Sequence, residues 1–325
     1  MEKNNAMDLR YLRQFNNKSI KLALLHPKNV SLLEELLEKE TRVFEDVQKR
    51  KLEPGVIPST NTLPTLLEEV KIHVDSFLGV KEITSPAIDY RLNYETYLAT
   101  RNKWKNAALI SGLLSGGALS TGAGNLLTDR ELATYAAASL LCFGGAFIYS
   151  ILKQTKNEKK FREENEESSS YWDNHISLKV EEKTMLIPTL AHEYTHHVQE
   201  EKGIPYYNGF ECFCEGQARS VQKQVGIKYF ILENNPAFLL NSLEDNLSEY
   251  KAVYFWLMAK LRKTPNVNLF LATSIYENQG DIDYFKEHNK PATHALGNVF
   301  FSLLESREGT EIHKAILQGE YHHIP

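Results

Sequence analysis

The chain has 325 residues, 42% of them hydrophobic, which is enough for a sizeable core. A chain of this length suggests two domains. The formal net charge of −5 gives no case for binding nucleic acid, so no nucleic-acid partner is expected. The three cysteines (Cys142, Cys212 and Cys214) imply no disulfide framework, and no apolar run follows the first residues as it would in a signal peptide.

The first hundred residues have a polar, helical pattern. Leucines recur at helical spacing over residues 32–37, and a break rich in Pro, Ser and Thr follows at residues 54–64. Residues 80–90 have a composition that suits a strand. We therefore expect a helical accessory region over residues 1–100.

Two uncharged runs come next, residues 106–127 and 132–152, and a short acidic turn separates them. Each run has about the 20 residues that a bilayer span requires. Gly112 and Gly116 form a G-x-x-x-G face of the kind that lets helices approach closely, so an oligomer through this face is possible. The pattern predicts a transmembrane helical hairpin over residues 104–152, with the lipid bilayer as a partner.

Basic residues flank this hairpin on both sides. By the positive-inside rule, both termini would face the cytosol, so the predicted localisation is a membrane protein with two spans. The first run is rich in Gly, Ala and Ser and contains Asn125, so a hairpin buried in a soluble protein or an oligomer is the alternative. The basic residues are Arg101, Lys103 and Lys105 before the hairpin and Lys153, Lys156, Lys159, Lys160 and Arg162 after it.

Residues 153–170 form a charged linker, and residues 171–325 follow as a separate domain. At its start, residues 176–182 alternate strictly between apolar and polar side chains, which predicts a half-buried strand. The rest of this domain is expected to be mostly helical. The helical patterns cover residues 210–225, 242–263, 267–279 and 294–308.

The most informative motif is His192-Glu193-Tyr194-Thr195-His196, in a predicted helix with Pro188 in its first turn. Residues i and i+4 share one face of a helix, so His192 and His196 can hold one metal ion. Glu193 lies beside a ligand, where its carboxylate can take a proton from a water molecule that the metal activates. The motif predicts one zinc ion per chain.

A third ligand is expected from the segment Phe210–Arg219. A catalytic zinc takes three protein ligands and keeps one open position, and two His with one Glu is a well-attested set. Glu215 follows His196 after eighteen intervening residues. Glu211, one helical turn earlier, remains an alternative ligand or a group that supports a ligand. Cys212 and Cys214 lack the spacing of a zinc finger, and packing is their expected role.

With these residues the chain resembles the gluzincins, the zinc peptidases of the thermolysin and aminopeptidase N type. The H-E-x-x-H motif, the eighteen-residue gap and E-G-x-A carry the resemblance. It implies that His192, His196 and Glu215 are the zinc ligands and that Glu193 is the general base. It also implies an α+β, mostly helical fold with a small sheet before the motif helix, and an upper lobe that begins within residues 1–100.

Further implications concern the substrate. In gluzincins an extended substrate pairs with a strand at the cleft, a role that would fall to residues 176–182. The G-x-M-E-N segment by which aminopeptidases hold a free amine is absent, so exopeptidase activity is not supported. Thermolysin-like enzymes also have an Asp one turn after the third ligand, where this chain has Arg219.

A second stretch, which begins at His294, resembles the C-terminal helix of small gluzincin domains. In that family a Tyr or a His at this place stabilises the oxyanion, which makes His294 a candidate catalytic residue. It could equally cap the helix after Pro291 and Thr293. The rival donors are Tyr276, Tyr284 and His288.

Together these patterns predict a membrane-attached zinc endopeptidase that acts on a peptide or protein substrate. One alternative is a soluble metallopeptidase with a buried hairpin. Another is a catalytically silent binding or scaffold protein of the same fold, and a third is a zinc hydrolase that acts on a non-peptide amide.

Overall fold

The computed structural model describes residues 7, 9–53, 55–90, 103, 106–110, 146–153, 155, 169–206, 209–263, 283–285 and 291–321. The chain divides into two compact units, one made of residues 1–89 and 169–325 and the other of residues 90–168. The first unit contains every candidate ligand.

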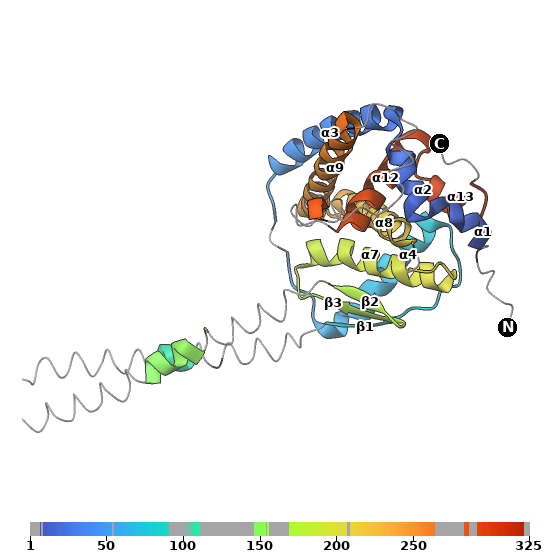
Figure 1. The fold of residues 1–325 in the computed structure, drawn as a ribbon. Coiled ribbons are helices and arrows are strands. Elements are labelled where there is room, and N and C mark those ends of the chain that lie inside the picture. Colours follow the sequence, from blue (N-terminus) through green and yellow to red (C-terminus); the bar gives the residue numbers. More distant parts are fainter. Residues whose placement is uncertain are drawn as a thin grey trace, which may run out of the picture. The chain divides into compact units, whose positions relative to one another are not determined.

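Helices dominate the first unit, and one small sheet accompanies them (Figure 1), so the predicted mostly helical α+β fold is confirmed. The helices before the sheet are α1 (Leu9–Leu12), η1 (Arg13–Phe15), α2 (Asn17–Leu24), α3 (Pro27–Gln48), η2 (Thr60–Thr62) and α4 (Leu63–Leu78). The strands are β1 (Ala87–Tyr90), β2 (Ser170–Trp172) and β3 (His175–Leu178). The later helices are α7 (Lys183–Glu201), α8 (Glu211–Glu233), α9 (Ala237–Lys263), α12 (Ala292–Glu308) and α13 (Ile312–Leu317).

The sheet has the strand order β1-β3-β2, and β2 pairs with β3 in antiparallel register, Tyr171 opposite Ile176. Ile176 and Leu178 are fully buried, as their alternation predicted, although the strand ends at Leu178 and does not reach residue 182. Because β3 has β1 on one side and β2 on the other, its backbone is already paired. Within the described sheet, the backbone of β3 is therefore not open to a substrate strand, and β1 and β2 are the outer strands. Pairing of a substrate with residues 179–182 stays a prediction.

Helix α7 begins earlier than predicted. Pro188 lies inside the helix and not in its first turn, because Lys183 N–H donates to Val56 O (2.9 Å) and the buried Leu186 and Ile187 extend the helix towards its N-terminus. A proline only five residues from the helix start removes one backbone hydrogen bond, near an end where donors lack partners in any case.

Helix α7 is surrounded by other elements and so is buried on nearly every side. It packs against α4, α8, β2 and β3, and α8 packs in turn against α12 (Figure 1). A helix buried all round normally has apolar residues all round. In α7, however, His192, Glu193, Thr195, His197 and Gln199 are buried as well. Because buried polar residues need hydrogen-bond partners or a function, α7 is a candidate for the functional helix.

The N-terminal helices pack on the C-terminal ones, so residues 1–89 contribute directly to the first unit. Helix α3 lies along α9, and α2 contacts α8 and α12. Asn17 connects α2 to the start of α8: its amide donates to Glu211 Oε2 (2.7 Å), and its carbonyl oxygen accepts from Cys212 N–H (2.8 Å). The sequence alone predicts only a helical accessory region over residues 1–100.

Among the described residues, no helix is both long and apolar enough to cross a membrane. Most of the two uncharged runs, 106–127 and 132–152, lies outside the described residues, as does the helix expected over 267–279. The transmembrane hairpin therefore stays a prediction. The other helical patterns match α8, α9 and α12, with α8 longer by eight residues at its C-terminal end.

Candidate metal centre

Helix α7 places the two motif histidines side by side. Their ring centroids are 4.8 Å apart, the rings are nearly perpendicular at 83°, and the two Nε2 atoms lie 3.1 Å from each other. This is the geometry that the i, i+4 spacing predicts for two side chains on one helix face. His192 is 8% exposed, so the pair lies at the edge of the core.

Helix α8 brings Glu215 to the same point from the other side. Glu215 Oε2 lies 3.3 Å from His192 Nε2, and Oε1 lies 3.6 Å from His196 Nε2. One ligand atom from each of the three residues can be chosen so that all lie within 4.8 Å of one another. The three predicted ligands thus converge, whereas Glu211, which bonds to Asn17, is not part of this group.

A close crossing of α8 and α12 sets the position of Glu215. Where the helices cross, Gly216 and Gly297 meet through their backbones, and a Cβ atom added at Gly216 would lie 2.7 Å from Gly297 Cα. Glycine is required here because any side chain would separate the two helices. Glu215 precedes one of these glycines, and His294 lies one helical turn before the other, so the crossing also brings these two side chains together.

His294 faces Glu215 and does not cap its helix. Its Nε2 lies 2.8 Å from Glu215 Oε2, and α12 begins after Pro291 without a side-chain cap. Of the rival donors, Tyr284 donates to Ala252 O (3.0 Å) and so is engaged elsewhere. The other two, Tyr276 and His288, lie outside the described residues.

A glutamine orients the second histidine. Gln199 Nε2 donates to Cys214 O (3.1 Å) and to Gln217 Oε1 (3.0 Å), so the Gln199 oxygen must face His196 Nδ1, 2.9 Å away. His196 Nδ1 is then the protonated nitrogen, which leaves the lone pair of Nε2 directed at the centre. Gln199 was not singled out from the sequence, although its position three residues after His196 places it on the same helix face.

The electrostatic state of the three residues suits a cation. Burial lowers the pKa of His192 to about 4, so its imidazole is neutral at pH 7. Burial alone would raise the pKa of Glu215, but the facing imidazoles outweigh it and hold that pKa well below its usual range. An ionised carboxylate beside the neutral imidazole of His192 is the state in which such residues bind a divalent metal.

The distances are of the size expected around a tetrahedral ion. With bonds of about 2.0–2.1 Å, such an ion separates its ligand atoms by about 3.3 Å. The two Nε2 atoms are 3.1 Å apart, and the histidines approach different oxygens of Glu215, His192 at 3.3 Å from Oε2 and His196 at 3.6 Å from Oε1. Glu215 is 2% exposed, and the nearest groups to its Oε2 are His294 Nε2 at 2.8 Å and His192 Nε2 at 3.3 Å. An ionised, buried carboxylate is costly unless a cation compensates it.

Glu193 is next to the centre but is not one of the converging donors. It is 7% exposed, and burial raises the pKa of its carboxyl to about 7. His196 and Arg219 act against this rise, and the backbone N–H of Tyr171 in β2 donates to the carboxylate. Glu193 is thus on α7 next to the ligand His192, and its carboxylate contacts strand β2.

Arg219 replaces the Asp that the resemblance would lead one to expect. It faces α9, where its guanidinium nitrogens lie 3.5 Å from Asp245 and 3.5 Å from Glu249. Glu249 is completely buried, and its other oxygen accepts from Asn298 (2.7 Å). Arg219 therefore compensates a buried carboxylate and does not orient a ligand histidine.

Tyr206 also touches the centre, a contact that sequence analysis missed. Its hydroxyl donates to Glu215 Oε1, and its ring lies edge-on to His196 with centroids 5.4 Å apart. The neighbouring cysteines Cys212 and Cys214 are buried, which agrees with the packing role expected of them.

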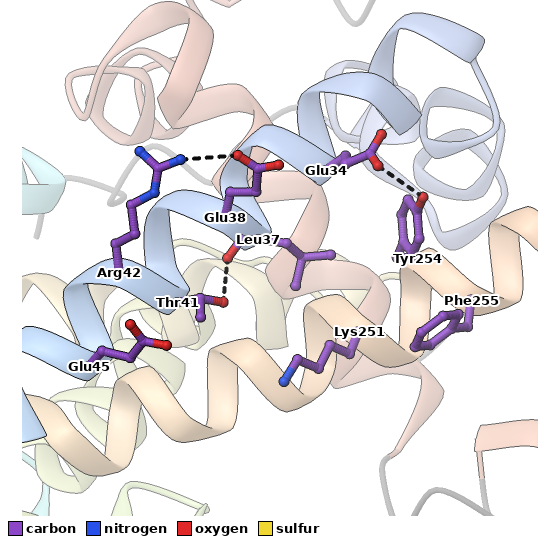
Figure 2. A pocket seen from close by; sticks show the side chains of 9 residues that line it. All are labelled: Glu34, Leu37, Glu38, Thr41, Arg42, Glu45, Lys251, Tyr254 and Phe255. Atoms are coloured by element: carbon purple, nitrogen blue, oxygen red, sulfur yellow. Dashed lines mark hydrogen bonds and ion pairs between the residues drawn. The ribbon is translucent and has the colours of Figure 1, made fainter.

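A separate groove of about 590 Å³ lies between α3 and α9 (Figure 2). Its side chains interact with one another: Arg42 pairs with Glu38 (3.3 Å), and Tyr254 donates to Glu34 (3.4 Å). They lie along the two helix surfaces and do not converge on one point (Figure 2), so we assign this groove no function.

No family model matches the sequence, and no curated protein or solved structure is significantly similar to the chain. A functional assignment therefore depends on the residues and distances described above.

Proposed function

We propose that the protein is a zinc-dependent peptidase of gluzincin type, in which His192, His196 and Glu215 hold one zinc ion. The observation that supports this most is the convergence of two imidazole nitrogens and one ionised carboxylate, 3.1 to 3.6 Å apart, beside a buried Glu193. Three protein ligands with a carboxylate next to them are typical of a catalytic site rather than a structural one.

Each residue then has a distinct role. Zinc in this place polarises a carbonyl group and lowers the pKa of water towards about 7. Glu193 accepts the proton of the attacking water and delivers it to the leaving amine, a task that suits a carboxyl whose pKa burial has raised to about 7. The charge of a bound dication would lower this pKa again and favour the basic form of Glu193.

His294, on α12, supplies a hydrogen-bond donor next to Glu215. Its Nε2 is 2.8 Å from Glu215 Oε2 and its side chain is 26% exposed, so it can also reach towards a substrate. A donor aimed at the oxygen of a tetrahedral intermediate commonly contributes a factor of about 100 to 1000 in rate. We assign this role to His294.

Strand β2 supports a peptide as the substrate. Among the strands that the structure describes, β2 is an outer one, it packs on α7, and its Tyr171 N–H contacts Glu193. An extended peptide added to this edge would pass the proposed base, with main-chain hydrogen bonds giving affinity for many sequences. A non-peptide amide would gain nothing from a strand edge, which disfavours that alternative.

Replacement of Glu193 by glutamine tests the proposal. We expect Glu193→Gln to bind one zinc ion per chain and to lose at least about 100-fold in peptide cleavage, while His196→Ala loses the metal. Glu201→Gln, on the same helix, is the matched control and should cleave normally. The proposal fails if the purified protein binds no zinc, or if Glu193→Gln cleaves as fast as the wild type. Zinc binding without any cleavage that depends on Glu193 would favour a silent scaffold.

Membrane attachment is a separate part of the proposal. It follows from the two uncharged runs and their basic flanks, and it predicts that the protein stays in the pellet when membranes are washed with carbonate. Recovery in the supernatant would favour a soluble peptidase whose hairpin is buried.

A further inference from the structure

The loop between α7 and α8 is fastened close to the metal centre. Ile204 N–H donates to Gln199 O (2.9 Å), the Ile204 side chain is 4% exposed, and Cys214 Sγ contacts Pro205 O at 4.0 Å. These contacts hold the backbone just before Tyr206. The position of the Tyr206 side chain is therefore a consequence of the way in which the two ligand helices are joined.

Tyr206 touches two of the three proposed ligands. Its hydroxyl donates to Glu215 Oε1, and its ring meets the ring of His196 edge-on at 89°. Tyr206 is 37% exposed, whereas Glu215 is 2% exposed. The side chain thus lies between the buried carboxylate and solvent.

The two oxygens of Glu215 are in different surroundings. Oε1 receives the phenol of Tyr206, whereas Oε2 faces two imidazoles, with His294 Nε2 at 2.8 Å and His192 Nε2 at 3.3 Å. A hydrogen bond to one oxygen of a carboxylate fixes the plane of the group and leaves the lone pairs of the other oxygen in a defined direction.

From this arrangement we propose that Tyr206 is a positioning residue for the metal: it holds Glu215 through Oε1 so that Oε2 is presented to the ion. This inference rests on the zinc centre proposed above. A ligand carboxylate that is held in place binds the metal without a further loss of side-chain freedom. The phenol also prevents bulk water from reaching Oε1 and replacing the hydrogen bond from Tyr206.

Tyr206→Phe separates this role from simple packing. Phenylalanine keeps the ring against His196 and removes only the hydroxyl, and at a half-exposed position it should leave the fold unchanged. We expect zinc affinity, measured by competition with a chromogenic chelator, to fall about 10-fold, the lower end of what loss of a group supporting a ligand costs. The absorption spectrum of the protein loaded with Co²⁺ should shift as well, because the carboxylate is no longer held in one orientation.

Tyr254→Phe is the matched control, because it removes a tyrosine hydroxyl that interacts with Glu34 at 3.4 Å, far along the chain from the ligands. It should change neither zinc affinity nor the Co²⁺ spectrum. Equal thermal stability of the three metal-free proteins would show that the fold is intact.

The outcomes separate the two proposals. If the wild type binds no zinc, the proposed function fails. If the wild type binds one zinc ion but Tyr206→Phe binds it equally well with an unchanged Co²⁺ spectrum, the zinc centre stands and the positioning role of Tyr206 is refuted.

Discussion

Gly297→Ala tests whether the crossing of α8 and α12 builds the metal centre. A Cβ atom at residue 297 would lie 2.0 Å from Cys212 O and 2.8 Å from Gly216 N, and both are backbone atoms that cannot rotate away. Since real Cβ atoms essentially never approach another atom within 3.0 Å, the helices must separate by about 1 Å.

Two effects should follow from this separation. Overpacking of this kind costs about 2 to 3 kcal/mol in the free energy of unfolding, which denaturant titration followed by circular dichroism measures. Glu215 and His294 would also move apart, and zinc affinity should fall about 10-fold. Ser306→Ala is the control on the same helix, because Ser306 is exposed and its loss should change stability by less than about 0.5 kcal/mol.

The reasoning would be refuted by a Gly297→Ala variant that unfolds at the wild-type denaturant concentration. That result would mean that the two backbones are not in contact in solution. Reduced stability together with unchanged zinc affinity would instead mean that the helix crossing stabilises the fold but does not determine zinc binding.

Two further predictions concern buried charges. Arg219→Met should cost about 3 kcal/mol in the free energy of unfolding, because Glu249 keeps its bond to Asn298 but loses the cation that faces it. The double variant with Glu249→Leu should regain part of this loss in the same urea titration, and a single variant as stable as the wild type would contradict the prediction. Burial alone would raise the pKa of Glu305, but His313 at 2.8 Å holds it below its ordinary value of 4.5. The ionised carboxylate therefore stabilises the fold above that pH, and the contribution is lost as the pH falls through the folded pKa. Glu305→Gln should flatten the acid side of a plot of stability against pH, and an acid side identical to the wild type would argue against this coupling.

The parts of the site that depend on local geometry could be predicted from the sequence. The i, i+4 spacing alone places His192 and His196 on one face of a helix. Glu215 needed more, because its approach depends on how α7 and α8 pack, and only the resemblance to gluzincins indicated it. For His294 the sequence left two roles open. Its contact with Glu215 arises from the glycine crossing, which joins residues distant in sequence.

Other features could not be predicted, for identifiable reasons. Tyr206 reaches Glu215 through a loop bounded by Gly203 and Gly209, both with positive φ, and no periodicity describes such a loop. Pro188 was placed in the first turn because proline favours that position, but burial of the preceding residues extended the helix beyond it. The apolar stripe of α3 required a partner, yet nothing in its pattern specified α9.

The first unit is discontinuous in sequence, since the chain leaves it at β1 and returns at β2. Both strands flank β3, so they lie two strand spacings apart, and each is at most four residues long. The end of β1 at Tyr90 and the start of β2 at Ser170 are therefore within about 16 Å of each other. A bridge of eight or so flexible residues could span that gap. The segment between β1 and β2, residues 91–169, could thus change in length or be replaced by another module while the helices that carry the proposed ligands stay unchanged.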